Sequence, residues 1–170
     1  MHHAIDTRQH EHEAITRGLQ ILTRMDERVS AEHITDIQDL SALTDFLKAF
    51  VDTCHHGKEE GILFPALQAK DLAQTQAPIA RMLDEHAQGR RHLADMQAAL
   101  QAEVNLKAFH EAARAYTALL LAHIDKEKPS CSRWPSDCYR AQSSRRWPML
   151  LRPMRTRSWG PGGTMRCTPP

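Results

Sequence analysis

The first 128 residues contain little of what builds a β-protein or a disulfide-stabilised domain. They hold one of the four cysteines, two of the nine prolines and none of the three tryptophans, and aromatic residues make up 5% of the chain. One cysteine excludes a disulfide framework within this part. No stretch shows the two-residue alternation and β-branched enrichment of a strand, and glycine and proline are scarce inside the periodic segments. We therefore expect no β-structure.

Long hydrophobic runs are also absent. No run approaches the roughly 18 apolar residues of a membrane span. Met1 is followed by polar, histidine-rich residues rather than by the apolar core of a secretion signal. The formal net charge of +1 argues against a nucleic-acid or anionic-membrane partner. We therefore expect a cytoplasmic protein with no nucleic acid and no membrane among its partners.

The chain joins two different compositions at about residue 128. Residues 1–128 carry 14 Lys/Arg against 20 Asp/Glu and all eleven histidines, whereas residues 129–170 carry eight Arg, one Asp and seven of the nine prolines. A length of 128 residues is enough for one domain with a hydrophobic core. The sequence therefore predicts a folded domain over 1–128 and a separate Arg/Pro/Trp-rich tail over 129–170.

Four segments of the first part show apolar residues at spacings of three and four, which is the helical period. The expected helices run from residue 5 to 29, from Asp36 through CHHGKEEGILFP at 54–65, from near Pro78, and from near Asn105. Pro65 is expected to end or kink the second helix. Because the connections are short, the pattern predicts an all-α fold, an antiparallel up-down four-helix bundle.

Polar residues interrupt the apolar row of each helix. On the second helix the row runs Leu47, Val51, His55, Glu59, Ile62. Across the four helices, the ionisable residues in these inward-facing rows are His12, His55, Glu59, His86, His123 and Glu127. A buried carboxylate is costly unless it is paired or coordinates a metal. These rows therefore raise the question of what the six residues bind.

The chain repeats itself around these residues. Glu11-His12 matches Glu85-His86, and HHGKEE at 55–60 matches HIDKEK at 123–128. His-x-x-x-Glu places both side chains on one helix face, one turn apart, so that both can reach one metal centre. Four imidazoles and two carboxylates suit iron, manganese or zinc, and two carboxylates that can bridge favour a dinuclear site.

Simpler readings exist for each residue taken alone. A single histidine on an apolar face is more often a hydrogen-bonded core residue than a ligand, but six ionisable residues in register across two repeats favour the metal. His56 is expected to contact the metal ligands without binding the metal itself. Glu60 could do the same or bind metal, although a solvated charge is the simpler reading. Lys58 and Lys126 read as ordinary surface charges that balance acidic neighbours. The remaining histidines read as surface or supporting residues: His2, His3, His10, His33, His92 and His110.

Four stretches carry a resemblance to a known family. They are EHEAI at 11–15, CHHGKEEGILFPAL at 54–67, EHAQGR at 85–90 and HIDKE at 123–127. The sequence resembles the hemerythrin-like domains of the HHE cation-binding type. This resemblance implies a four-helix bundle around a non-haem di-iron centre, with two iron ions joined by an oxo or hydroxo bridge. It implies that Glu59 and Glu127 bridge the ions and that the four histidines of the rows complete the ligand set.

One departure narrows the expected function. Oxygen-carrying hemerythrins have a second histidine four residues after the position of His86, where this chain has Arg90. The resemblance is therefore to the four-His, two-Glu subtype, which is linked to handling or sensing oxygen, peroxide or iron. Weak oxygen- or peroxide-reactive enzyme activity and an iron-binding or storage module without catalysis both stay open, and no catalytic residue is assigned. A ferritin-like site needs Glu-x-x-His pairs, which residues 1–128 lack.

The tail departs from the family after residue 128. If the codons of Lys128 onward are read from each third base, the genetic code permits TILFPMAERLL, a counterpart of GILFPAL at 61–67. We therefore interpret residues 129–170 as a frame-shifted, non-native and mostly irregular segment. The rival interpretation is a natural Arg/Pro-rich tail that binds an acidic partner.

Overall fold

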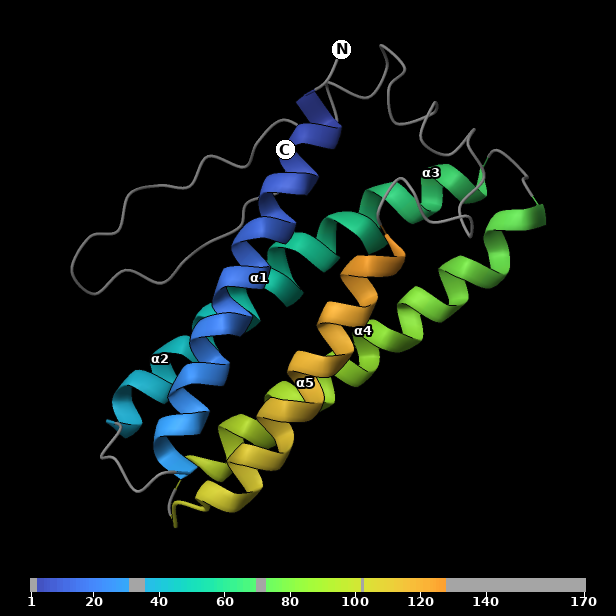
Figure 1. Ribbon diagram of the computed structural model, residues 1–170. Helices are drawn as coiled ribbons and strands as arrows, with labels where there is room; N and C mark the ends of the chain where they lie inside the picture. The colour runs from blue at the N-terminus through green and yellow to red at the C-terminus, as the bar shows by residue number, and fades with distance from the viewer. Residues whose placement is uncertain (1–2, 31–35, 70–72, 102, 128–170) are drawn as a thin grey trace.

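The computed structural model describes residues 3–30, 36–69, 73–101 and 103–127 (Figure 1). Within these ranges all regular structure is helical, which confirms the all-α prediction. None of the helices in these ranges is long and apolar enough to cross a membrane. The predicted tail at 129–170 lies outside the described residues.

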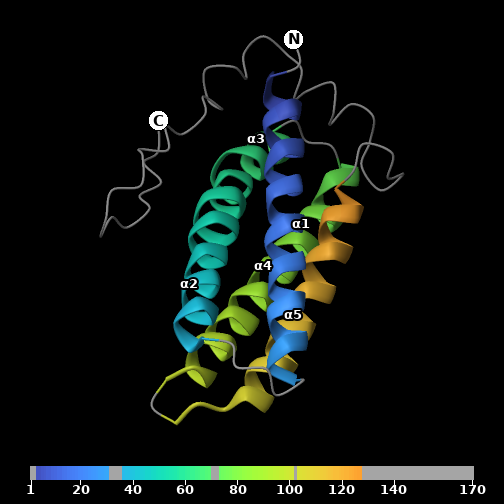
Figure 2. The ribbon, with the colours of Figure 1, turned by 60° about the vertical axis from the view of Figure 1, so that its left-hand side comes forward.

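The described chain forms four long helical runs. Their elements are α1 (His3–Ser30), α2 (Ile37–Leu47), η1 (Lys48–His56), η2 (Glu59–Leu63), α3 (Phe64–Gln68), α4 (Ala73–Ala99) and α5 (Leu106–Lys126). The second run comprises α2, η1, η2 and α3. Neighbouring runs point in opposite directions and lie side by side in both views (Figures 1 and 2), and α4 packs on α5, which packs on α1. This is the predicted antiparallel up-down four-helix bundle.

Two of the predicted helix starts are set by capping side chains. Asp36 accepts a hydrogen bond from the backbone N–H of Gln38 at 2.8 Å, and α2 begins at the next residue. Asn105 accepts from the backbone N–H of Ala108 at 3.0 Å, and α5 begins at Leu106. Each cap satisfies one N–H that has no partner inside its helix, which stabilises the start by about 1 kcal/mol.

The helix start predicted near Pro78 and the helix end predicted at Pro65 were both wrong in position. Helix α4 begins at Ala73, so Pro78 lies inside it rather than at its start, and one interior hydrogen bond is lost there. Pro65 neither ends nor separates the second run, because it is the second residue of α3 and helix continues to Gln68. The first turn of a helix tolerates a missing N–H, so the proline fits where π-helix gives way to α-helix.

The middle of the second run is π-helical. Buried residues recur there every four positions, at Leu47, Val51, His55, Glu59 and Leu63. Each step of four overshoots an α-helical turn by about 40°, so an ideal α-helix would rotate the fifth residue about 160° away from the first. Hydrogen bonds from i to i+5 widen the turn and keep the row facing inward. For this reason Leu63 is buried, and Ile62, which the sequence placed in the row, is only partly so.

Two apolar clusters lie on either side of the polar residues. The larger cluster fills the bundle between α1, α2, α4 and α5, and its most buried members include Leu22, Leu47, Met96, Phe109 and Tyr116. The smaller one, here called the α3–α4 cluster, consists of Leu63, Phe64, Leu67, Ile79 and Met82. Along the second run and along α4, the row of histidines and glutamates falls between the two clusters. Both clusters therefore shield it from bulk water.

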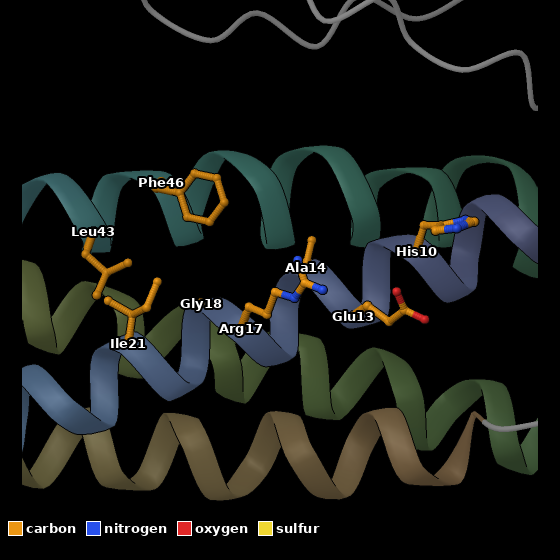
Figure 3. Close-up of a pocket in the computed structure, with 8 residues that line it drawn as sticks. All are labelled: His10, Glu13, Ala14, Arg17, Gly18, Ile21, Leu43 and Phe46. Carbon is orange, nitrogen blue, oxygen red and sulfur yellow. The ribbon is translucent and has the colours of Figure 1, made fainter.

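The first and second runs approach each other closely at one glycine. A Cβ atom on Gly18 would lie 3.2 Å from Cδ2 of Leu47, so a larger residue would require the Leu47 side chain to shift by a few tenths of an ångström. Beside this contact the outer faces of the two helices form a groove of about 530 Å³ (Figure 3). The groove is lined by His10, Glu13, Ala14, Arg17, Gly18, Ile21, Leu43 and Phe46. None of the six predicted ligands lines it.

Candidate metal centre

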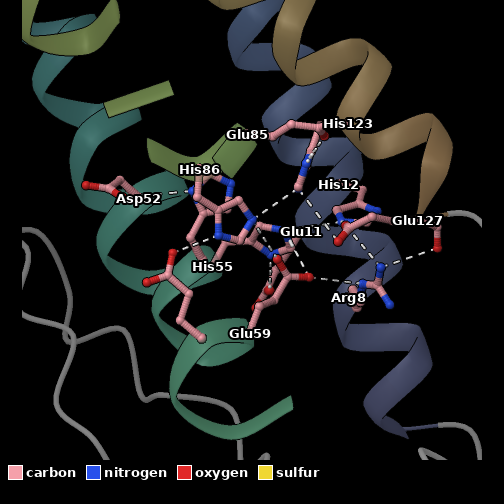
Figure 4. A network of polar contacts seen from close by, with 12 residues as sticks. Arg8, Glu11, His12, Asp52, His55, Glu59, Glu85, His86, His123 and Glu127 are labelled. Atoms are coloured by element: carbon pink, nitrogen blue, oxygen red, sulfur yellow. Dashed lines mark hydrogen bonds and ion pairs between the residues drawn. The ribbon is translucent and has the colours of Figure 1, made fainter. Parts of the chain in front are cut away.

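All six residues singled out from the sequence meet inside the bundle (Figure 4). Helix α1 supplies His12, η1 His55, η2 Glu59, α4 His86, and α5 with its C-cap supplies His123 and Glu127. Five of them are at most 3% exposed, and His12 is partly buried. The structure thus brings together every residue of the predicted set, from all four helical runs.

The four imidazoles form two facing pairs. Nε2 of His12 lies 3.2 Å from Nε2 of His55, and Nε2 of His86 lies 3.3 Å from Nε2 of His123. We call His12 and His55 the outer pair, because the His12 side chain is 13% exposed, and His86 and His123 the inner pair, at 0% and 1%. Two nitrogens that bind one ion at about 2.1 Å lie roughly 3.0–3.4 Å apart. Each pair therefore has the spacing to hold one ion.

The two glutamates each reach toward both pairs. Glu59 places Oε1 3.8 Å from Nε2 of His55 and Oε2 3.4 Å from Nε2 of His86. Glu127 places Oε2 3.0 Å from Nε2 of His12 and Oε1 3.6 Å from Nε2 of His123. Each pair of imidazoles thus faces one oxygen of each carboxylate. Carboxylates arranged in this way can bridge two ions.

In each repeat, a carboxylate contacts Nδ1 of one histidine, on the side of the ring away from the facing histidine. Nδ1 of His55 lies 3.0 Å from Oε2 of Glu11, and Nδ1 of His123 lies 3.0 Å from Oε2 of Glu85. With Nδ1 donating to a carboxylate, the neutral imidazole presents a bare lone pair at Nε2, toward the facing histidine. Nε2 of His55 and Nε2 of His123 are thereby left to bind a cation or a proton.

The lysines of the repeat complete these two contacts. Lys58 binds the other oxygen of Glu11, and Lys126 binds the other oxygen of Glu85. These contacts fit the sequence reading of both lysines as charges that balance acidic neighbours, although that reading had assigned no role to Glu11 or Glu85. The signal was present, since the Glu before each lone histidine and the Lys before each paired Glu both recur.

The inner histidine on α4 has a different support. Nδ1 of His86 donates to Oε1 of Glu60 at 2.7 Å, and Arg90 binds the same oxygen at 3.1 Å. Arg90 also donates to Oδ1 of Asp52 at 2.8 Å. Glu60 therefore supports a histidine, and its reading as a solvated charge was wrong. Arg90, the residue that departs from the oxygen carriers, lies behind the histidine and not among the facing nitrogens.

A guanidinium group lies against both central carboxylates. Nε of Arg8 is 3.4 Å from Oε1 of Glu59, and Nη2 is 3.0 Å from Oε2 of Glu127. Its side chain is 18% exposed, so it borders the outer pair and reaches the surface. Arg8 precedes His12 by one helical turn on α1. Sequence reasoning missed this residue, because nothing in the chain marks which surface arginine will fold over a site.

The carboxylates stay ionised despite their burial. Desolvation and repulsion from Glu127 both raise the pKa of Glu59, but its interactions with His55, His86, Arg8 and further neighbours together lower that pKa by more, and the net shift is downward. Desolvation also raises the pKa of Glu127, but the charge of Arg8 and the contacts with His12 and His123 together outweigh it, so this pKa lies well below its usual value. Two buried negative charges are therefore available for a cation.

Protons take part in balancing these charges when no metal is bound. Desolvation lowers the pKa of His55, but Glu59 and Glu11 attract its proton, and the pKa rises above the usual value. Desolvation likewise lowers the pKa of His123, and the hydrogen bond to Glu85 and nearby carboxylates raise it by more. One imidazole of each facing pair therefore holds a proton more tightly than a free imidazole does. A metal ion would have to displace these protons.

A fifth imidazole lies beside the inner pair. His56 is 2% exposed, and its ring stacks on that of His86 with centroids 3.7 Å apart and planes 12° from parallel. Burial lowers the pKa of His56 to about 4. Ligand atoms of His56, His86 and His123 lie within 4.8 Å of one another. The sequence had placed His56 behind the ligands, whereas the structure places it within the cluster.

The donor set fits a metal better than it fits an empty core. Both oxygens of Glu59 are buried without a well-formed hydrogen bond and have only longer contacts, at 3.4 Å to Arg8 and 3.4 Å to His86, although buried oxygens almost always form one. The group contains imidazole and carboxylate donors, which suit iron, manganese and zinc. Nitrogen pairs at coordination spacing, each faced by two carboxylate oxygens, could hold metal at two positions.

Four antiparallel helices that enclose such a cluster define a metal-binding helical bundle. The family model of the hemerythrin HHE cation binding domain matches residues 3–128, and the chain belongs to this family. No curated protein and no solved structure matches the chain. The resemblance seen in the sequence motifs is confirmed at the level of the family.

Proposed function

We propose that this protein binds two iron ions in a carboxylate-bridged centre and uses them to handle or sense oxygen or peroxide. The observation that carries the proposal is the paired geometry: two imidazole pairs at 3.2 and 3.3 Å, with one oxygen of Glu59 and one of Glu127 facing each pair. The six ligands are the residues of the inward rows, His12, His55, Glu59, His86, His123 and Glu127.

Several features support a dinuclear centre over a single ion. Each carboxylate directs its two oxygens to different pairs, which is the arrangement of a carboxylate that bridges two ions. The supports are duplicated as well, with Glu11 behind His55 and Glu85 behind His123. A repeat that carries ligands together with their supports favours two equivalent positions.

Iron bound there would supply reversible one-electron chemistry and a place for oxygen or peroxide to bind. The residues of the chain would orient the ligands, exclude bulk water and control access. The inner pair lies between the two apolar clusters and is closed to solvent. The outer pair lies beside His12 and Arg8, whose side chains are 13% and 18% exposed. A small ligand would therefore approach from the α1 side.

Metal analysis with an optical spectrum tests the proposal. Protein purified with iron should contain about two iron ions per chain and show near-ultraviolet charge-transfer bands of a di-ferric centre. Iron content near zero, or one tightly bound zinc ion, would refute it.

Rapid mixing of the reduced protein with oxygen, and separately with peroxide, tests the chemistry. We expect the iron spectrum to change with at least one of them. If two iron ions bind but neither reagent changes the spectrum, the protein is an iron-binding module without catalysis.

A further inference from the structure

We infer that Arg8 is a built-in counter-cation of the metal centre, which holds Glu59 and Glu127 while no metal is bound and releases them when an ion enters. Arg8 thereby determines how tightly metal binds at the position of the outer pair. This inference rests on the proposed function, since it concerns the same centre. It gives a role to a residue that none of the four family motifs includes.

The charge of Arg8 lies between the two central carboxylates (Figure 4). Nη2 is 3.0 Å from Oε2 of Glu127, and Nε is 3.4 Å from Oε1 of Glu59. Both carboxylates are buried, and buried carboxylates that repel each other need positive charge nearby. The two lysines near the site, Lys58 and Lys126, bind other carboxylates instead. Arg8 therefore supplies a permanent positive charge to the central carboxylates when no metal is bound.

Arg8 contacts the two oxygens that face the outer pair. Oε2 of Glu127, which Arg8 contacts, is also 3.0 Å from Nε2 of His12. Oε1 of Glu59, the other oxygen that Arg8 contacts, faces Nε2 of His55. The second oxygen of each carboxylate faces the inner pair. An ion at the outer pair would take the two oxygens that Arg8 contacts, whereas an ion at the inner pair would leave both contacts in place.

Arg8 and an ion at the outer pair therefore compete. A divalent ion and a guanidinium group a few ångströms apart repel each other, and a buried setting screens this repulsion only weakly. An ion that takes the carboxylate oxygens also removes the favourable contacts of Arg8 in the metal-free protein. Both effects oppose binding, so Arg8 lowers the affinity of the outer position for metal.

The structure allows Arg8 to be displaced. Its side chain is partly exposed, so it reaches the buried carboxylates from the surface. Nε lies 3.4 Å from Glu59 without a well-formed hydrogen bond, which makes this contact a weak one. The long, flexible arginine side chain can turn its charged end toward water while the helix backbone stays in place. Displacement of Arg8 thus requires no rearrangement of the bundle.

A purely structural role is the alternative. Nη2 of Arg8 also donates to the backbone oxygen of Glu127 at 3.3 Å, which ties α1 to the end of α5. Loss of such a tie would loosen the bundle and would leave metal affinity unchanged or lower it. Loss of a counter-cation would instead raise metal affinity. The sign of the change in affinity therefore distinguishes the two roles.

The substitution Arg8→Gln tests this sign, because glutamine keeps part of the side chain and removes its charge. Arg24→Gln is the matched control, since Arg24 is exposed on the same helix, more than four turns away. Fe²⁺ affinity is measured without oxygen by competition with a coloured ferrous chelator. The more weakly bound of the two ions should bind at least tenfold more tightly in Arg8→Gln than in wild type. Arg24→Gln should stay within twofold of wild type.

The metal-free proteins should show the opposite effect on stability. Arg8→Gln should lower the melting temperature by about 5 °C or more, because two buried carboxylates lose their cation. The same substitution in a Glu127→Gln background should lower it by less than half as much, since one of the two negative charges is already gone. If Arg8→Gln alone does not fold, a folded double variant carries the same conclusion.

Tighter Fe²⁺ binding together with lower metal-free stability supports the proposal. Unchanged or weaker Fe²⁺ binding in Arg8→Gln would overturn it, and so would equal losses of melting temperature in the two backgrounds. Absence of iron from the wild-type protein would instead refute the proposed di-iron function. In that case the metal-free comparison still tests whether Arg8 balances the charge of the carboxylates.

Discussion

The duplicated supports of the metal site give a quantitative prediction for Glu11→Gln. Glu11 accepts a hydrogen bond from Nδ1 of His55 at 3.0 Å and binds Lys58, and its side chain is 17% exposed. Glutamine keeps the size of the side chain and removes its charge. Loss of such a support typically lowers metal affinity 10–100-fold, which is about 1.4–2.7 kcal/mol. We expect a fall in Fe²⁺ affinity of this size.

Two effects of the substitution oppose each other, and pH separates them. Removing the charge of Glu11 makes His55 a weaker ligand, which lowers metal affinity. It also lowers the pKa of His55, because Glu11 contributes to the raised pKa of this residue. A metal then displaces the proton of His55 more easily, which raises metal affinity. Above the pKa of His55 in the metal-free protein, no proton remains to compete. At such a pH only the loss of ligand strength remains, so the full decrease in affinity should appear in alkaline buffer and shrink as the pH falls.

Competition with a coloured ferrous chelator under anaerobic conditions measures the affinity. Glu13→Gln is the matched control, because Glu13 is exposed on the same helix, two residues away. Glu85→Gln should repeat the effect at His123, since the second half of the chain carries the same contact at 3.0 Å. Affinities of Glu11→Gln and Glu13→Gln that agree within twofold in alkaline buffer would refute the reasoning.

Three further predictions concern ligands, pH and the tail. His55→Ala or Glu127→Ala should lower iron content and the melting temperature of iron-loaded protein, because binding is coupled to folding. His92→Ala should change neither quantity. Equal losses in all three variants would mean that the ligand assignment is wrong. Burial lowers the pKa of His56 to about 4 from 6.5, so the metal-free protein should lose roughly 3 kcal/mol of stability as pH falls from above 6.5 through 4. Denaturant titrations should show a correspondingly smaller loss in His56→Phe, and equal losses would contradict the burial argument. Replacing residues 128–170 with TILFPMAERLL should raise the melting temperature by adding a counterpart to the α3–α4 cluster, at about 1.5–3 kcal/mol per buried side chain; an unchanged melting temperature would count against the frame shift.

The linear sequence was enough to predict the bundle and the six residues at its centre. The helical period decides which residues face inward, because side chains three and four apart share a helix face whatever the neighbouring helix is. Histidine and glutamate in those rows could then be recognised as a group, and the repeat of Glu-His and His-x-x-Lys-Glu showed that two halves of the chain carry the same group. Capping residues such as Asp36 and Asn105 marked helix starts for an equally local reason.

Contacts between helices required the tertiary structure. Periodicity gives the face of a residue but neither the rotation nor the height of the neighbouring helix. Nothing in the chain therefore showed that Glu11 reaches His55, that Lys58 binds Glu11, or that Arg8 contacts both buried carboxylates. The π-helical turn is a second example. In this turn, hydrogen bonds from i to i+5 replace the α-helical ones, and residues spaced four apart then all face the core. The replacement is favourable only when the rest of the bundle is in place to bury those residues. That turn brings His56 into the cluster, where an α-helix would have directed it away.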